Sequence, residues 1–305
     1  MPHRFIAAVD LGASNVRVAI ADPDGEIEAR RVFPFPGGSP EDVLGRIGRT
    51  IDDLVRGVWV GARVAAIGVV LPGSVDPSAG TVDTAANLPG WGEVPIARLL
   101  GEPRGVPVVA ENDANAAAVG ERWLGAAKGL DDIVFVALGT GIGAGVILRG
   151  ELRRGAHLLS GEVAYFRMTR EQLHARDWQH CLEGVAGGRA FAETAAELLG
   201  PNAKVADLFD AAYAGDERAA AWLRETQDHL AMATVSIAAL LDPQAVVFGG
   251  GVIAAQGERL LGPVRDAALT CLPSPLRIVQ SSLGEDAQVL GAVRLALDRL
   301  EGQKP

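Results

Sequence analysis

Hydrophobic and polar residues follow two different periods along the chain, and these periods predict both strands and helices. Apolar residues that run together or alternate indicate strands, whereas a recurrence every three or four residues indicates helices. In the segment 40–56, for example, Val43, Ile47, Ile51 and Leu54 share one helical face. The pattern predicts strands at 5–10, 16–21, 26–32, 64–71, 106–110, 133–138, 145–148, 245–248 and 276–280, and helices at 40–56, 114–124, 187–199, 217–241 and 287–300. Because strands and helices alternate, the fold class is α/β.

Two predicted strand–turn–strand segments contain glycines in their turns. The strand 5–10 ends in Leu11-Gly12-Ala13-Ser14-Asn15, and the strand 133–138 ends in Gly139-Thr140-Gly141-Ile142-Gly143. A glycine turn lets backbone N–H groups approach phosphate oxygens closely, and a plain hairpin needs fewer glycines than the second segment contains. The recurrence predicts a coarse internal duplication with one phosphate loop in each half.

A carboxylate follows the strand 106–110, in the sequence Glu111-Asn112-Asp113. Asp113 precedes an alanine-rich helical segment, so it can cap that helix or serve as a general base, and the two roles are compatible. A carboxylate that accepts a proton from an attacking hydroxyl, near a phosphate-binding turn, is typical of a kinase that acts on a small alcohol.

Composition narrows the class of protein. With 305 residues and 49% hydrophobic residues, the chain can bury two cores and is not disordered. The net charge of −10 disfavours nucleic acid as a partner. Asp10 interrupts the first apolar run, so no signal peptide is indicated, and no apolar run is long enough to span a bilayer. Cys181 and Cys271 offer no disulfide framework. We therefore expect a soluble, cytoplasmic protein without a membrane partner.

Nine short segments, taken in their order along the chain, resemble one known family. They are Asp10-Leu11-Gly12-Ala13-Ser14-Asn15, Pro72-Gly73, Asn87-Leu88-Pro89-Gly90-Trp91, Glu111-Asn112-Asp113-Ala114-Asn115, Leu138-Gly139-Thr140-Gly141-Ile142-Gly143, Arg154-Gly155-Ala156, Gly161-Glu162, Cys181-Leu182-Glu183 and Val247-Phe248-Gly249-Gly250-Gly251. In this order they resemble the ROK family (repressors, open reading frames and kinases) of the actin, hexokinase and Hsp70-like ATPase superfamily. The resemblance covers nearly the whole chain.

The resemblance implies a two-lobed actin-like ATPase fold, also called ribonuclease H-like, with duplicated α/β lobes around a nucleotide and sugar cleft. We expect an N-terminal lobe of residues 1–115, joined by a C-terminal helix at 288–305, and a C-terminal lobe of residues 116–287. The implied activity is that of a glucokinase-like enzyme. It would phosphorylate a hexose, glucose or a close relative, at the 6-hydroxyl with ATP, and Asp113 would be the general base.

The resemblance also implies roles for individual residues. Asp10 would hold Mg²⁺ through water, since the metal must neutralise the phosphates. The implied sugar-binding residues are Asn87, Asn112, Asp113, Glu162, Tyr165 and Glu183, and the implied nucleotide-binding residues are Asp10, Gly12, Ser14, Asn15, Thr140, Gly141, Gly249 and Gly250. Without the resemblance, the two glutamates are typical of a solvated surface, and Asn87 of a turn.

The sequence departs from the family pattern most clearly between Gly161 and Glu183. The family's structural zinc is bound by one histidine and three cysteines, but Tyr165 stands in place of the histidine and Cys181 is the one cysteine left. Because a structural zinc site needs about four nitrogen or sulfur ligands, we expect no zinc. A rebuilt metal site would use His174, Asp177, His180 and Cys181. Two smaller departures are Ala13 in place of a glycine and Ser14 in place of a threonine.

Several alternatives remain open at this point. Tyr165 replaces a histidine that touches the sugar, so an amino sugar or a cyclitol is an alternative substrate. A non-catalytic, sugar-sensing ROK regulator is disfavoured, because nine residues before Asp10 are too few for a helix-turn-helix. The sequence does not distinguish among hexoses or between ATP and polyphosphate as donor. The expected partner is a small-molecule sugar, and a homodimer is one candidate for the oligomeric state.

Overall fold

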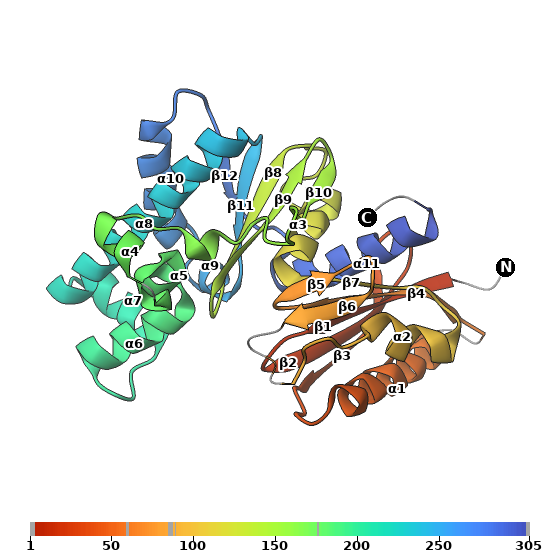
Figure 1. Ribbon diagram of the computed structural model, residues 1–305. Coiled ribbons are helices and arrows are strands. Elements are labelled where there is room, and N and C mark those ends of the chain that lie inside the picture. The colour runs from red at the N-terminus through yellow and green to blue at the C-terminus, as the bar shows by residue number, and fades with distance from the viewer. Residues whose placement is uncertain (1–3, 59–60, 85–87, 89, 176, 303–305) are drawn as a thin grey trace. The chain divides into compact units, whose positions relative to one another are not determined.

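The computed structural model describes residues 4–58, 61–84, 88, 90–175 and 177–302. Asn87 lies outside the described residues. The chain divides into two compact units (Figure 1). Unit 1 comprises Met1–Gly129, Glu151–Ser160 and Glu285–Pro305, and unit 2 comprises Leu130–Gly150 and Gly161–Gly284. The expected lobe boundary after residue 115 falls inside helix α3 (Asp113–Leu124), and this division assigns the whole helix to unit 1.

Unit 1 contains a five-stranded sheet in the order β3-β2-β1-β4-β7. Strands β1, β2 and β3 are antiparallel neighbours, whereas β1, β4 and β7 run parallel. The register pairs Val9 of β1 with Val18 of β2 and with Val69 of β4. The strands are β1 (Arg4–Leu11), β2 (Asn15–Ala21), β3 (Ile27–Pro34), β4 (Arg63–Leu71) and β7 (Val108–Asn112).

Helices cover both faces of the unit 1 sheet because alternate residues of each strand point to opposite faces. Ala7 and Val9 of β1 pack in the same cluster as helix α1 (Pro40–Val58). Ile6 and Ala8 pack in the cluster that contains helix α11 (Ala287–Leu300). Two smaller elements complete the unit, the hairpin β5 (Ser74–Asp76) and β6 (Thr81–Thr84) and the helix α2 (Ile96–Gly101).

Helices α3 and α11 approach each other through glycines. A Cβ atom on Gly291 of α11 would lie 1.8 Å from the carbonyl oxygen of Ala116. A Cβ atom on Gly120 of α3 would lie 2.3 Å from the carbonyl oxygen of Ala287. Larger residues at either position would therefore push the two helices apart.

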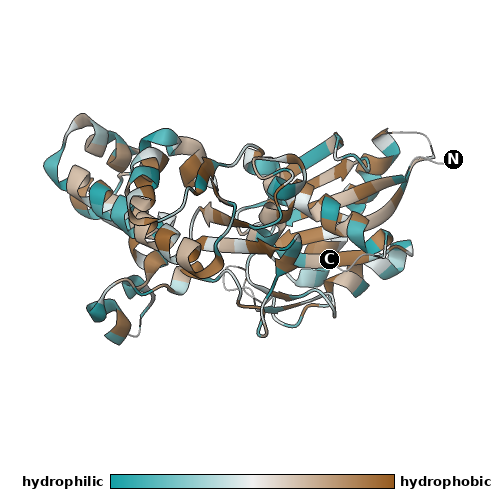
Figure 2. Cartoon of the chain, turned by 90° about the horizontal axis from the view of Figure 1, so that it is seen from above, coloured by the Kyte–Doolittle hydropathy of each residue, from teal (hydrophilic) through white to brown (hydrophobic). Residues whose placement is uncertain are grey.

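Unit 2 repeats the same arrangement of strands. Strand β8 (Ile133–Leu138) pairs with β9 (Ile142–Leu148) antiparallel and with β11 (Ala245–Gly249) parallel, and β11 pairs with β12 (Arg277–Gln280) in parallel. The chain leaves unit 2 after β9 for the short strand β10 (Glu151–Arg153), which belongs to the unit 1 segment. Figure 2 shows that the strands consist largely of hydrophobic residues, as the predicted cores require.

The helices of unit 2 pack around an aromatic centre. The rings of Phe191, Phe209 and Trp222 meet edge to face, with centroids 5.1–5.6 Å apart. These residues belong to α6, α7 and α8, respectively. The helices are α4 (Arg170–His174), α5 (Leu182–Ala186), α6 (Gly188–Leu199), α7 (Val205–Ala214), α8 (Glu217–Leu241), α9 (Gly251–Gln256) and α10 (Glu258–Cys271).

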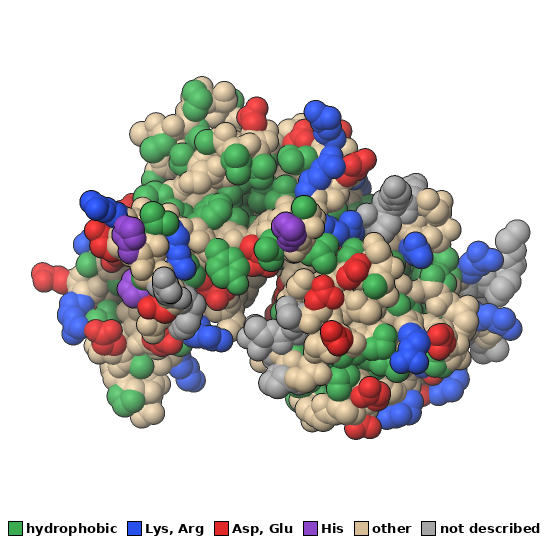
Figure 3. All heavy atoms as spheres, viewed as in Figure 1, with side chains coloured by type: hydrophobic (Ala, Val, Ile, Leu, Met, Phe, Trp, Pro, Cys, Tyr) green, Lys and Arg blue, Asp and Glu red, His purple; other side chains and the backbone are tan. Residues whose placement is uncertain are grey.

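The predicted α/β class and most predicted elements are confirmed, including the bounds of α8 and α11. The sequence pattern missed the β5–β6 hairpin, the short strand β10 and the helices α4, α5, α7, α9 and α10. Pro263 lies inside α10, where it removes a backbone donor and weakens the helical signal. Within the described part of the chain, no helix combines the length and apolar character needed to cross a bilayer. On the face shown in Figure 3, acidic and basic side chains are interspersed over unit 1.

Candidate functional site

Asp113 occupies the first position of helix α3, directly after strand β7. Asn112 is the N-cap residue, since its Oδ1 accepts hydrogen bonds from the backbone amides of Ala114 (2.9 Å) and Asn115 (3.2 Å). Capping therefore belongs to Asn112, and the capping role considered for Asp113 from the sequence is wrong. Oδ1 of Asp113 accepts from the same amide of Ala114 at 2.8 Å, and the residue is half-buried.

Glu111 and Arg154 hold this turn from within unit 1. Glu111 is buried, and its Oε1 accepts from the backbone amide of Asn112 and from Nδ2 of Asn115, both at 2.9 Å. Its Oε2 accepts from Nε of Arg154 at 2.7 Å. Both residues lie in the segments that carry the family resemblance, but sequence reasoning gave them no role. A buried ion pair with these additional bonds fixes the backbone that carries Asp113.

The side-chain amide of Asn112 forms hydrogen bonds through both its oxygen and its nitrogen. While Oδ1 caps α3, Nδ2 donates to the carbonyl oxygen of Gly73 at 3.1 Å. The side chain assigned to a sugar hydroxyl thus also connects β7 to the turn that follows β4.

The first glycine turn is closed by its own backbone. The amide of Gly12 donates to the carbonyl oxygen of Asn15 at 2.9 Å, and the carbonyl oxygen of Ser14 accepts from the amide of Phe35 at 2.8 Å. The side chains of Ser14 and Asn15 are exposed. This part of the turn is therefore accessible to a ligand.

Asp10 lies buried beside the first turn. Burial raises the pKa of its carboxyl, and the Arg17 guanidinium, whose Nη1 lies 2.8 Å from Oδ2, opposes that rise. Carboxylate oxygens are ligands that Mg²⁺ prefers, so the residue type fits the metal. A metal held by Asp10 would share this carboxylate with Arg17.

The second glycine turn is held by residues from a distant part of unit 2. Its own closing bond runs from the amide of Gly139 to the carbonyl oxygen of Gly141 at 3.0 Å. The amides of Gly188 and Arg189 donate to the carbonyl oxygens of Gly139 and Thr140, both at 2.9 Å. Thr140 itself is exposed.

Glu162 and Glu183 lie near each other in unit 2. Desolvation of the Glu162 carboxyl, and next the negative charge of Glu183, raise the pKa of Glu162. Oε2 of Glu183 accepts from the backbone amide of Ile142 at 2.9 Å, at the end of the second turn. The structure therefore brings Glu162, Glu183 and the second turn together. Tyr165 ends the short 3-10 helix Val163–Tyr165 and is 66% exposed.

Gly249 and Gly250 also lie against the start of the second turn. Gly250 has a φ of 91°, and a Cβ atom there would lie 2.5 Å from the carbonyl oxygen of Leu138, the last residue of β8. A Cβ atom on Gly249 would lie 2.5 Å from the ring of Phe135. Backbone conformation and close packing both require glycine here.

The segment with the altered zinc motif contains one contact between possible metal ligands. Nδ1 of His180 contacts Oδ1 of Asp177, and Cys181 is buried at the start of α5. Among the residues that the structure describes, no three or more His, Cys, Asp or Glu side chains are grouped so that they could hold a metal ion. The absence of zinc stays a prediction.

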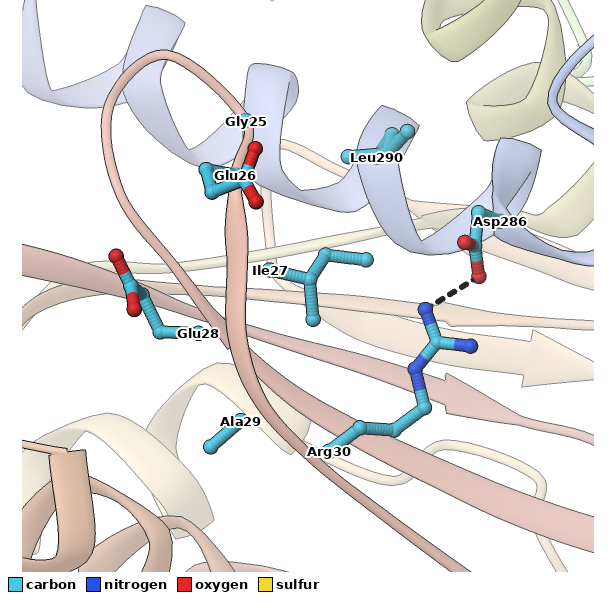
Figure 4. A pocket seen from close by; sticks show the side chains of 8 residues that line it. All are labelled: Gly25, Glu26, Ile27, Glu28, Ala29, Arg30, Asp286 and Leu290. Carbon is cyan, nitrogen blue, oxygen red and sulfur yellow. Dashed lines mark hydrogen bonds and ion pairs between the residues drawn. The ribbon is translucent and has the colours of Figure 1, made fainter.

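A pocket of about 470 Å³ lies elsewhere in unit 1, between the start of β3 and the start of α11 (Figure 4). Nη2 of Arg30 and Oδ1 of Asp286 form an ion pair of 2.5 Å across it. The pocket includes none of the predicted site residues. It is lined by Gly25, Glu26, Ile27, Glu28, Ala29, Arg30, Asp286 and Leu290.

Comparison with known proteins identifies the family. Residues 6–299 match the ROK family. The chain belongs to the ROK family. It is 34% identical to the glucokinase of Thermotoga maritima over 323 aligned positions, which cover 99% of this chain and 100% of the relative. It is 30% identical to the N-acetylmannosamine kinase of Escherichia coli O127:H6, covering 95% of this chain and 97% of the relative.

Solved structures agree with this assignment. The ROK hexokinase from Thermus thermophilus superposes with a TM-score of 0.87 at 30% identity, covering 98% of this chain and 99% of the other. A ROK family glucokinase from Streptomyces griseus, in complex with glucose and AMPPNP, gives a TM-score of 0.78 at 31% identity, covering 96% and 99%. The expected actin-like ATPase fold is confirmed, and the ROK chain is a sugar kinase, a phosphotransferase.

Proposed function

We propose that this ROK sugar kinase transfers the γ-phosphoryl group of ATP to the 6-hydroxyl of a hexose, glucose or a close relative. The glucokinase from Thermotoga maritima and the glucose and AMPPNP complex from Streptomyces griseus support the choice of sugar and donor. The observation that carries the proposal is the position of Asp113, a half-buried carboxylate at the first residue of α3. Its neighbour Asn112 caps the helix.

Asp113 would accept the proton of the sugar hydroxyl as its oxygen attacks the γ-phosphorus. The N-terminus of α3 stabilises negative charge, which suits a carboxylate that must be ionised to act as a base. Because Asn112 caps the helix and Glu111 bonds to the backbone amide of Asn112, the carboxylate is presented on a fixed backbone. Fixed geometry of this kind accounts for a large share of the rate in phosphoryl transfer.

The remaining assignments divide between the two units. In unit 1, the turn of Gly12, Ser14 and Asn15 offers backbone and hydroxyl groups to phosphate oxygens. In unit 2, the Thr140–Gly141 turn and Gly249–Gly250 are assigned to the nucleotide, and Glu162 and Glu183 to sugar hydroxyls. Mg²⁺, when bound, supplies positive charge to the phosphates, and Asp10 would hold it through water.

A kinase for an amino sugar is the second candidate. Its support is the N-acetylmannosamine kinase of Escherichia coli, which is 30% identical, and the exposed Tyr165 at the position of the family's sugar-touching histidine. A cyclitol is a third substrate class that the exposed tyrosine leaves open.

A phosphoryl-transfer screen tests these candidates together. Glucose, mannose, N-acetylmannosamine and a cyclitol would each be offered with ATP and with polyphosphate, and the phosphorylated product would be measured. We expect the highest kcat/KM for glucose with ATP. Preference for N-acetylmannosamine would favour the second candidate, and no transfer to any hexose would refute the proposal.

A further inference from the structure

Glu183, which is assigned to a sugar hydroxyl, also accepts a hydrogen bond from the backbone of the second glycine turn. We infer that Glu183 is a positioning residue for the second glycine turn, residues 139–143, and that it links this turn to the sugar-binding carboxylates. The part of this inference that concerns nucleotide and sugar rests on the proposed function. The link between Glu183 and the turn rests on the structure of unit 2 alone.

The first step is the hydrogen bond between the backbone amide of Ile142 and Oε2 of Glu183, at 2.9 Å. Ile142 is the first residue of β9, so this bond holds the point where the turn becomes a strand. A carboxylate acceptor makes a stronger bond to a backbone amide than a neutral acceptor does. The turn thus depends on a side chain 41 residues away in the sequence.

Gly141 shows that the turn is built around this carboxylate. A Cβ atom on Gly141 would lie 2.2 Å from Oε2 of Glu183, which is far inside van der Waals contact. Gly141 is not among the glycines with a positive φ, so its backbone conformation alone does not exclude alanine. A Cβ atom at this position would therefore have to displace the Glu183 carboxylate from its place beside the turn.

The junction between α5 and α6 adds further bonds to the same turn. Glu183 is in the first turn of α5, and the amides of Gly188 and Arg189 at the start of α6 donate to carbonyl oxygens of the turn. A Cβ atom on Gly188 would lie 2.4 Å from the carbonyl oxygen of Gly139. The turn is therefore held by one side chain and by two backbone amides from one short segment.

Glu183 also interacts with Glu162, the other carboxylate of unit 2 assigned to the sugar. Its negative charge raises the pKa of Glu162, so the two carboxylates are close enough to interact. A sugar hydroxyl bound to Glu183 would share that carboxylate with the amide of Ile142. Occupancy of the sugar site would then change the bond that shapes the nucleotide turn.

Amide hydrogen exchange on the ligand-free protein tests the link directly. We expect the Ile142 amide to exchange about ten-fold faster or more in Glu183→Ala, since the variant removes its acceptor. Glu183→Gln keeps an oxygen acceptor but loses the charge, so it should recover part of the protection and exchange within a few-fold of the wild type. Glu162→Ala is the matched control, because it removes the neighbouring carboxylate and should leave this amide unchanged. Equal exchange in Glu183→Ala and in the control would overturn the inference.

A double-mutant cycle tests the same link through nucleotide binding. The Kd of AMPPNP with Mg²⁺ would be measured without sugar by calorimetry. Glu183→Ala and Gly141→Ala should each weaken binding by about ten-fold, since each displaces the same carboxylate from the turn. In Gly141→Ala/Glu183→Ala the clash is absent, so the double variant should bind about as well as Glu183→Ala alone. If the double variant weakened binding by the product of the two single effects, the two positions would act independently and the inference would be overturned.

The two tests separate this inference from the proposed function. Exchange at Ile142 needs no substrate, so it can support the positioning role even if no hexose is phosphorylated. Conversely, full glucose kinase activity together with unchanged exchange in Glu183→Ala would leave the proposed function standing and remove the positioning role.

Discussion

The two glycine turns lie in the same pattern of strand pairing but differ in the contacts that hold them. Each follows a strand that pairs antiparallel with the next strand and parallel with a later one: β1 with β2 and β4, and β8 with β9 and β11. The first turn is closed locally by Gly12 and Asn15, whereas the second also depends on Glu183. Both turns also accept backbone hydrogen bonds from later residues, Phe35 for the first and Gly188 and Arg189 for the second, but the bond to Glu183 adds a distant side chain to the second turn.

The carboxylates beside the two turns differ in the same way. Asp10 in unit 1 faces Arg17 across the β1–β2 register, so the buried negative charge has a cation. Glu183 in unit 2 instead accepts from a backbone amide and interacts unfavourably with Glu162. The charge beside the first turn is therefore balanced within a hairpin, whereas the two carboxylates beside the second turn would gain partners from the hydroxyls of a bound sugar.

The largest expected effect is on kcat and comes from a variant outside both turns. It tests whether Asp113 of unit 1 is the general base. Asp113→Asn should lower kcat at least about 10²-fold, because the amide keeps the shape but cannot accept the proton. Sugar affinity, measured by calorimetry, should stay within a few-fold. Asp210→Asn on the exposed surface of α7 is the matched control. A variant that retains most of its kcat would rule out Asp113 as the base.

The next effect tests whether the buried charge of Asp10 depends on its cation. Arg17→Met should destabilise the protein by about 3–5 kcal/mol in urea unfolding at neutral pH, because it leaves Asp10 buried without its cation. Burial holds the folded pKa of Asp10 above its unfolded value, and protonation removes the penalty. The loss should therefore shrink as the pH falls.

The control for Arg17→Met is Arg31→Met, in the neighbouring strand β3. The ion pair of Arg31 with Asp53 is exposed, at 3.6 Å, so its loss should cost less than about 1 kcal/mol. Equal losses in the two variants would contradict the idea that the Asp10 charge depends on Arg17.

Sequence patterns predicted most of the strands and long helices, because the pattern of apolar residues that indicates each element lies within one segment. The apolar runs of β1 and β8 and the period of α8 and α11 each lie within one segment. The sequence could not identify the N-cap of α3, because Asn112 and Asp113 are adjacent and both residue types are good helix caps. The bond from Ile142 to Glu183 joins residues that only the folded chain brings together. Sequence therefore indicated the second turn but not what holds it.

A smaller effect concerns the proposed role of Tyr165 in sugar choice. Tyr165→His restores the residue type of the family and should change kcat/KM ratios among glucose, mannose and amino sugars by a few-fold, as expected for one hydrogen bond. KM for ATP is the internal control and should change less. A competition assay on sugar mixtures measures the ratios. If only stability changes, Tyr165 is a packing residue and does not determine specificity.

The smallest effect tests the repulsion between the unit 2 carboxylates. The folded pKa of Glu162 is raised, so its contribution to stability is present below the unfolded pKa, near 4.3, and is lost as the pH rises through the folded value. Glu162→Gln should therefore be more stable than the wild type at neutral pH, by no more than about 0.5 kcal/mol because the residue is exposed. The difference should vanish near pH 4. Glu193→Gln on α6 gives the baseline, and a less stable Glu162→Gln at pH 7 would contradict the repulsion.

Helix α11 has a consequence for how the chain is made. Unit 1 uses this helix to cover one face of its sheet, through contacts as close as Gly291 to Ala116, yet all of unit 2 precedes it in the sequence. At a synthesis rate of about 5–20 residues per second, the ribosome would need on the order of ten seconds to translate unit 2. During that interval the face of the nascent unit 1 sheet that packs against α11 lacks this helix. Unit 1 therefore begins synthesis first but can complete this face only after unit 2 has been made.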